Sequence, residues 1–94
     1  MATLLTDEEC KAGLGNLPEW RLENLCLVRV TKRPSFLEGI DLVRRVAELA
    51  EASDHHPDID IRWRTLTFGL TTHSAGGLTQ KDFDLAREIE ALMG

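Results

Sequence analysis

A long amphipathic stretch at residues 35–53 separates two segments whose side chains alternate with the period of β-strands. Apolar residues recur within it at spacings of three and four, which predicts a helix capped by Ser35. Pro57 disfavours helical geometry at His56, so we expect the helix to end by Ser53 or Asp54. We expect its inner face to comprise Leu37, Ile40, Val43, Ala47 and Ala50, widened by Leu42, Val46 and Leu49.

The segment before this helix predicts a β-hairpin. Trp20 and Leu22 alternate with charged residues, which is typical of a short strand. Asn24 marks a turn, and the apolar and β-branched run at 25–30 predicts a second strand that pairs antiparallel with the first.

The segment after the helix predicts a second hairpin. Ile59, Ile61 and Trp63 share one side, whereas the later apolar residues, Leu66, Phe68 and Leu70, have the opposite phase. Such a change of phase requires a turn or a bulge after Trp63. We therefore expect two antiparallel strands here.

Both ends of the chain carry helix signals. Thr6 and Glu9 form a capping-box pattern that opens a short helix ending near Gly13 or Gly15. Thr79 is expected to cap a last helix with an inner face of Leu85, Ala86, Ile89, Leu92 and Met93. The order helix, two strands, helix, two strands, helix predicts an α+β fold with an antiparallel sheet, as one domain over residues 1–94.

Charge and length limit the classes of partner. The net charge of −5 argues against direct nucleic-acid binding and against binding to a membrane surface. The two distant cysteines, Cys10 and Cys26, suggest reduced thiols in a cytoplasmic protein, and neither a signal peptide nor a membrane span is evident. A chain of 94 residues buries a modest share of its surface, so we expect a homo-oligomer.

The three histidines, His55, His56 and His73, are the candidate functional side chains. Surface histidines often have no special role, and neighbours in an extended segment point to opposite sides, which disfavours a shared metal ion. Imidazole exchanges protons near neutral pH, so acid–base chemistry fits better. Pairing of the last two strands would bring Pro57 and His73 together, and with them all three histidines, at one end of the sheet.

A seven-residue pattern surrounds these histidines. The pattern begins with an acidic residue, Glu51, and after three positions continues with His-His-Pro at 55–57. An aromatic residue, Trp63, follows after five further positions. His73 follows after nine further positions, and Asp82 after eight more. This pattern resembles the signature of the pterin-4a-carbinolamine dehydratase family, and the order of helices and strands resembles that family over nearly the whole chain.

The resemblance implies a four-stranded antiparallel sheet with three helices, assembled as a homodimer or homotetramer. It implies dehydration of a 4a-hydroxy-tetrahydropterin to the quinonoid dihydropterin, in pterin recycling, without a metal or organic cofactor. By resemblance the histidines line the pterin site, with His55 and His73 as acids toward the hydroxyl and His56 binding the ring and handling the N5 proton. The alternative is a non-catalytic module of the same fold that binds or assembles with other proteins.

The other signature residues keep two interpretations. Asp82 could serve the N-terminus of the last helix or orient a histidine. Glu51 falls in the last turn of the long helix, where a negative charge is mildly unfavourable, which favours a functional role. Trp63 has the apolar phase of its strand, so core packing is favoured over stacking on the pterin. Pro57 holds His56 extended.

Overall fold

The computed structural model describes residues 3–93, and over these residues the chain forms three α-helices and one four-stranded sheet. The elements follow one another as α1 (Asp7–Gly15), β1 (Arg21–Glu23), β2 (Cys26–Lys32), α2 (Phe36–Ser53), β3 (Asp58–Arg62), β4 (Thr65–Leu70), a 3₁₀ turn η1 (His73–Ala75) and α3 (Gln80–Met93). The predicted α+β class and element order are confirmed. None of the helices within residues 3–93 is long and apolar enough to cross a membrane.

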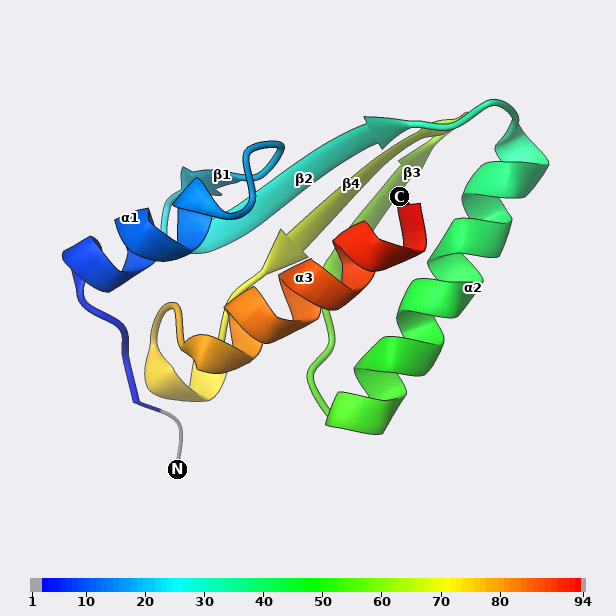
Figure 1. Ribbon diagram of the computed structural model, residues 1–94. Helices are drawn as coiled ribbons and strands as arrows, with labels where there is room; N and C mark the ends of the chain where they lie inside the picture. Colours follow the sequence, from blue (N-terminus) through cyan, green and yellow to red (C-terminus); the bar gives the residue numbers. More distant parts are fainter. Residues whose placement is uncertain (1–2, 94) are drawn as a thin grey trace.

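The sheet has the order β1-β2-β4-β3, and all neighbouring strands are antiparallel. Each hairpin joins strands that are consecutive in the chain, and the two hairpins meet where β2 pairs with β4. Figure 1 shows α2 and α3 side by side along one face of this sheet. The arrangement is a two-layer sandwich in which helices cover the apolar side of the strands.

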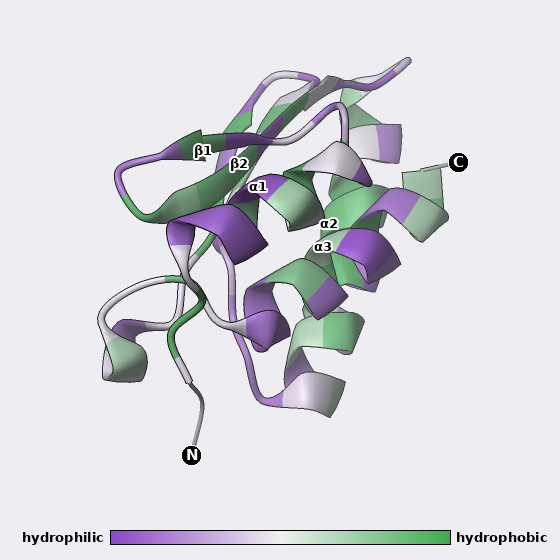
Figure 2. Ribbon diagram, turned by 60° about the vertical axis from the view of Figure 1, so that its left-hand side comes forward, coloured by the Kyte–Doolittle hydropathy of each residue, from purple (hydrophilic) through white to green (hydrophobic). Residues whose placement is uncertain are grey.

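The core lies between the sheet and the helices. Leu66, Phe68 and Leu70 of β4 are fully buried, and they belong to one apolar cluster with Val46 of α2 and Ile89 of α3. Burying a large apolar side chain contributes roughly 1.5–3 kcal/mol. The hydropathy colouring in Figure 2 shows apolar and polar residues alternating along α2 and α3, as expected for helices with one buried side.

The buried side of α2 differs from the predicted one. Ser35 caps the helix as expected, with its Oγ accepting from the backbone N–H of Glu38 at 3.1 Å. However, Leu37 is 77% exposed and Ala47 is also exposed, so the prediction for these two residues is wrong. The buried residues of α2 are Gly39, Leu42, Val46 and Ala50. Periodicity detects the wide apolar stripe on this helix, but the position of the sheet decides which part of it is covered.

The turns of both hairpins contain residues that were predicted to lie in strands. Leu25 and Trp63 have left-handed backbone angles, with φ of 62° and 59°. Leu25 lies in the two-residue turn between β1 and β2, and Trp63 directly follows β3. Trp63 is 87% exposed, so the predicted core packing of this side chain is wrong. Side chains of β3 alternate between the two faces of the sheet only as far as Arg62, where the strand ends and the chain reverses. Trp63 lies in the turn and therefore does not continue the face that carries Ile59 and Ile61.

The first and last helices begin differently. At α1 the predicted capping box is confirmed: Thr6 Oγ1 accepts from the backbone of Glu9, and the Glu9 carboxylate accepts from the backbone of Thr6. At α3 the hydroxyl of Thr79 bonds to Thr72 instead of capping, while the Asp82 carboxylate accepts from the backbone N–H of Thr79 at 2.9 Å. The carboxylate half of the predicted capping arrangement is therefore present, and the hydroxyl half is not.

Candidate active site

The open end of the β3–β4 hairpin brings the histidine-bearing segments together. Asp58, the first residue of β3, pairs with Gly69 near the end of β4. The chain that enters β3 carries His55 and His56, and the chain that leaves β4 carries His73 in η1. The hairpin pairing predicted from the sequence is confirmed, and it places both segments at the same end of the sheet.

Local backbone geometry sets the position of His55. Helix α2 ends at Ser53, and the C-cap residue Asp54 takes the left-handed conformation with φ of 50°. The backbone N–H of His55 still donates to the carbonyl of Ala50 at 3.0 Å, so His55 is held against the last helical turn. Pro57 then keeps the chain extended as it enters β3. The side chain of His55 is thereby turned toward α3.

His55 and Asp82 form a nearly buried pair. Nε2 of His55 lies 2.6 Å from Oδ1 of Asp82, and their side chains are 10% and 0% exposed. The other carboxylate oxygen, Oδ2, accepts from the backbone N–H of Thr79 and from the hydroxyl of Thr72, at 2.9 Å and 2.8 Å. The sequence left Asp82 with two roles, the helix N-terminus and the histidine; its carboxylate contacts both.

His56 and Glu51 form a second pair on the surface. Nε2 of His56 lies 2.5 Å from Oε2 of Glu51, and the two side chains are 56% and 77% exposed. An exposed pair of this kind contributes little to stability. Its effect is on orientation, because the carboxylate on the last turn of α2 holds the imidazole ring in place.

The two pairs leave the same ring nitrogen available in each histidine. A carboxylate only accepts hydrogen bonds, so Nε2 of a neutral imidazole bonded to it must carry the proton. Nδ1 of His55 and of His56 is then the nitrogen with a free lone pair. Each ring can take a proton at Nδ1 while the carboxylate stabilises the imidazolium that forms, as the aspartate does in a catalytic triad.

The remaining predicted site residues fall into two groups. His73 is exposed at the start of η1, beyond the end of β4, and Pro57 is partly buried beside the histidine pair. Trp63 is different, because it follows the far end of β3. Five residues of β3 lie between Pro57 and Trp63, so six steps of about 3.3 Å separate the two residues by roughly 20 Å. The fold does not bring Trp63 to the histidines within one chain.

A model of the family described as "Pterin 4 alpha carbinolamine dehydratase" matches residues 3–92 of this chain. The chain belongs to the pterin-4-alpha-carbinolamine dehydratase family. The resemblance seen in the histidine signature is thus confirmed over nearly the whole sequence, and the family is one of hydro-lyases.

Individual members of the family are closely similar to the chain. A protein of Mycobacterium avium (strain 104), whose name places it in this family, is 59% identical over 91 residues, which is 97% of each chain. A namesake from Mycolicibacterium vanbaalenii is 57% identical over 91 residues, covering 97% of this chain and 98% of its own. The crystal structure of a transcriptional coactivator/pterin dehydratase from Brucella melitensis superposes with a TM-score of 0.95 at 29% identity, covering 98% of this chain and all of the other.

Sequence reasoning missed Thr72, whose hydroxyl donates to the Asp82 carboxylate, and it considered Thr79 only as a helix cap. A signal for Thr72 was present. It continues the buried phase of β4 after Leu66, Phe68 and Leu70, and it is itself buried. A hydroxyl in an apolar phase requires a hydrogen-bond partner, so a polar residue at that position indicates a buried polar contact.

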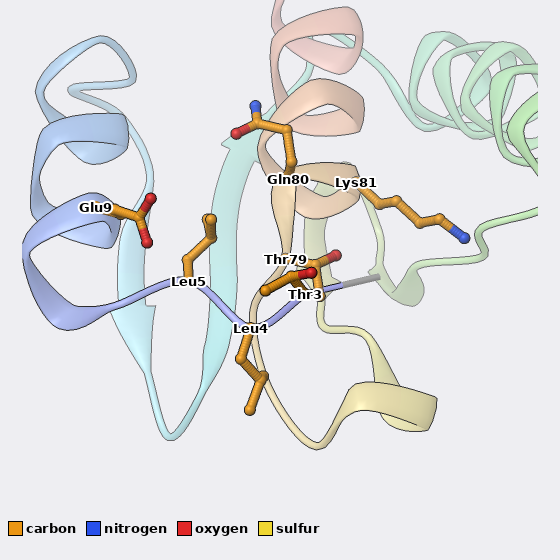
Figure 3. Close-up of a pocket in the computed structure, with 7 residues that line it drawn as sticks. All are labelled: Thr3, Leu4, Leu5, Glu9, Thr79, Gln80 and Lys81. Carbon is orange, nitrogen blue, oxygen red and sulfur yellow. The ribbon is translucent and has the colours of Figure 1, made fainter. Parts of the chain in front are cut away.

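An open pocket of about 490 Å³ lies on the other side of the α3 N-terminus. Figure 3 shows its lining, which comes from the N-terminal segment, from α1 and from the residues at the start of α3: Thr3, Leu4, Leu5, Glu9, Thr79, Gln80 and Lys81. No histidine lines it. Thr79 lines this pocket and also takes part in the hydrogen-bond network around Asp82, through its backbone N–H and its hydroxyl.

The cysteines are not suited to nucleophilic chemistry. Cys10 and Cys26 are both free thiols. Burial raises the pKa of each thiol, and nearby carboxylates raise it further. Both sulfurs therefore stay protonated near neutral pH. Within residues 3–93 no three histidine, cysteine or acidic side chains converge as a metal site would require.

Proposed function

We propose that this chain dehydrates a 4a-hydroxy-tetrahydropterin to the quinonoid dihydropterin and water, in the recycling of tetrahydropterin. Membership of the dehydratase family supports the reaction class. The observation that carries the proposal for the site is the buried bond between His55 and Asp82 beside the exposed pair of His56 and Glu51. Two carboxylate-oriented imidazoles near a third histidine supply both an acid and a base near neutral pH.

The reaction requires one proton to be given and one to be taken. The hydroxyl on C4a leaves as water when an acid protonates it, and a base removes the proton from N5 as the C4a–N5 double bond forms. We assign His55 and His73 as acids toward the hydroxyl. His56 binds the ring and accepts the N5 proton at Nδ1. The exposure of His56 and His73 supports this assignment, because both can exchange protons with water between turnovers.

The remaining signature residues are assigned to substrate binding and to positioning. Glu51 and Asp82 orient His56 and His55, and Pro57 holds the segment between α2 and β3 extended. Trp63 contacts a pterin only if another copy of the chain contributes it, because it lies at the far end of β3. We assign no metal or organic cofactor to the reaction, which needs only proton transfers.

A direct assay tests the proposed function. Purified protein is expected to accelerate dehydration of a 4a-hydroxy-tetrahydropterin, and activity is expected to be the same after treatment with a chelator, since imidazoles supply the protons. The rate is measured from formation of the quinonoid product, with untreated protein as the control. Loss of activity in chelator that returns on adding a metal ion would refute this mechanism.

Association of the chain is a separate prediction. Several large apolar side chains are largely exposed, among them Leu37, Trp63 and Leu25 at 77%, 87% and 63%. Burial of such surfaces between subunits favours closed homo-oligomers. We expect at least a dimer, and the family resemblance implies a dimer or a tetramer. Light scattering at protein concentrations on the order of tens of micromolar measures the oligomeric state. A monomer at these concentrations would contradict the prediction.

The alternative function is a module that binds other proteins. The exposed apolar side chains support it, and the similar Brucella protein is described as a transcriptional coactivator/pterin dehydratase. A binding module has no need of carboxylate-oriented histidines, so the enzyme is favoured. The histidine substitutions described in the Discussion separate the two functions.

A further inference from the structure

Two buried hydroxyl groups lie behind the Asp82 carboxylate. Thr72 Oγ1 is 2.8 Å from Asp82 Oδ2, and Thr79 Oγ1 is 2.8 Å from Thr72 Oγ1. Thr72, Thr79 and Asp82 are 5%, 1% and 0% exposed. They connect the segment after β4 with the start of α3, and through Asp82 they reach His55.

The direction of these hydrogen bonds follows from counting protons. Each threonine hydroxyl has one proton to donate, and an ionised carboxylate can only accept. Thr72 therefore donates to Asp82, which leaves its oxygen to accept from Thr79. Oδ2 of Asp82 receives two donors, one from Thr72 and one from the backbone of Thr79, and Oδ1 receives Nε2–H of His55.

We propose that Thr72 is a positioning residue for His55. Its hydroxyl fixes the plane of the Asp82 carboxylate, so that Oδ1 holds His55 as the Nε2–H tautomer and leaves Nδ1 as the nitrogen that exchanges protons with the pterin. The identity of the substrate rests on the proposed function. The tautomer of His55 does not depend on the proposed function, because it is a property of the protein without substrate.

Packing alone does not require a hydroxyl at this position. Thr72 follows the apolar phase of β4, where valine has nearly the same shape as threonine and no desolvation penalty. The helix N-terminus is also served without it, because Asp82 already accepts from the backbone of Thr79. What only the Thr72 hydroxyl supplies is a second donor on Oδ2, which prevents the carboxylate from rotating away from His55.

The electrostatic surroundings leave Asp82 as the charge that faces His55 across a hydrogen bond. Cys10 of α1 and Cys26 of β2 also interact with Asp82, but burial raises the pKa of both thiols, so they are neutral near pH 7. The other nearby pair, His56 and Glu51, is exposed to water, which weakens its influence on His55.

The test is Thr72→Val in the full chain labelled with ¹⁵N. In the unmodified protein at about pH 8.5, two units above the ordinary titration point of imidazole, the ¹⁵N spectrum is expected to show His55 as the Nε2–H tautomer. Thr72→Val is expected to give a mixture of tautomers. It should also lower kcat roughly ten- to a hundredfold with little change in KM, by analogy with the loss of a partner that orients a metal-bound histidine.

Two controls accompany this variant. Thr72→Ser keeps the hydroxyl and is expected to restore both the tautomer and kcat. Thr71→Val removes a neighbouring hydroxyl, which donates to the carbonyl of Leu25 at 2.8 Å, and is expected to change neither. If Thr72→Val does not yield folded protein, Thr72→Ala carries the same expectation, since it also lacks the hydroxyl.

Two outcomes would overturn the proposal. One is a Thr72→Val protein that keeps the Nε2–H tautomer of His55, whatever its turnover. The other is a Thr72→Ser protein that folds but does not recover the tautomer. If the unmodified chain does not dehydrate pterins, the proposed function fails, while the ¹⁵N spectra still decide the role of Thr72.

Discussion

His56→Ala and His73→Ala are each expected to lower turnover by about a hundred- to ten-thousandfold, the range typical of general acid–base catalysis. Both side chains are exposed, and substitutions at such positions usually change the free energy of unfolding by less than about 0.5 kcal/mol. The two variants should therefore melt close to the unmodified chain. Turnover and thermal melting are measured together on the same preparations.

His55→Ala is expected to lower turnover to a similar extent, with a preference for one configuration at C4a, because acids on different sides of the ring serve different faces. Unlike the other two, it should also melt at a lower temperature. Its side chain is 10% exposed and bonded to buried Asp82, so its removal leaves a carboxylate oxygen without a donor, at a cost of about 1–3 kcal/mol.

Ser74→Ala is the control for the histidine series, since Ser74 is exposed beside His73 in η1 and has no assigned role. It should retain both turnover and melting temperature. Near-normal turnover in both His56→Ala and His73→Ala would refute the acid–base assignment. That result would favour the protein-binding module instead.

Asp82→Asn is expected to lower kcat by up to about ten-thousandfold, the effect of the equivalent change in a serine protease triad. The amide oxygen can still accept from Thr72 and from the backbone of Thr79, in the place of Oδ2. The amide NH₂ then faces His55 and donates to Nε2, which reverses the tautomer and puts the proton on Nδ1. The fold should persist, but the imidazolium form of His55, which acts as the acid, loses the carboxylate that stabilises it.

Steady-state kinetics and ¹⁵N spectra of His55 check this prediction. Asp84→Asn is the matched control, because Asp84 lies on the same helix but is exposed and bonds to the surface residues Gln80 and Arg87. It should retain turnover. If Asp82→Asn also retains turnover, the carboxylate serves only the N-terminus of α3 and not the chemistry.

The sequence alone was sufficient for the order of the elements and for the end of the sheet at which the histidine-bearing segments meet. Capping residues and Pro57 define where α1 and α2 begin and end, and alternation identifies β4. These signals are local, because they depend on backbone geometry within a few residues. The change of phase after Trp63 also implied the β3–β4 hairpin, which brings the segments bearing His55 and His73 to one end of the sheet.

Tertiary structure decided the features that depend on neighbours distant in the chain. Periodicity could not tell which part of the α2 stripe faces the sheet, so Leu37 was expected to be buried and is exposed. Alternation could not tell that β3 stops before Trp63. Asp82 contacts His55 across 27 positions and Thr72 across 10, and no local pattern encodes such a contact. The carboxylate's partners were decided by packing α3 against the end of β4, where a buried charge must find donors.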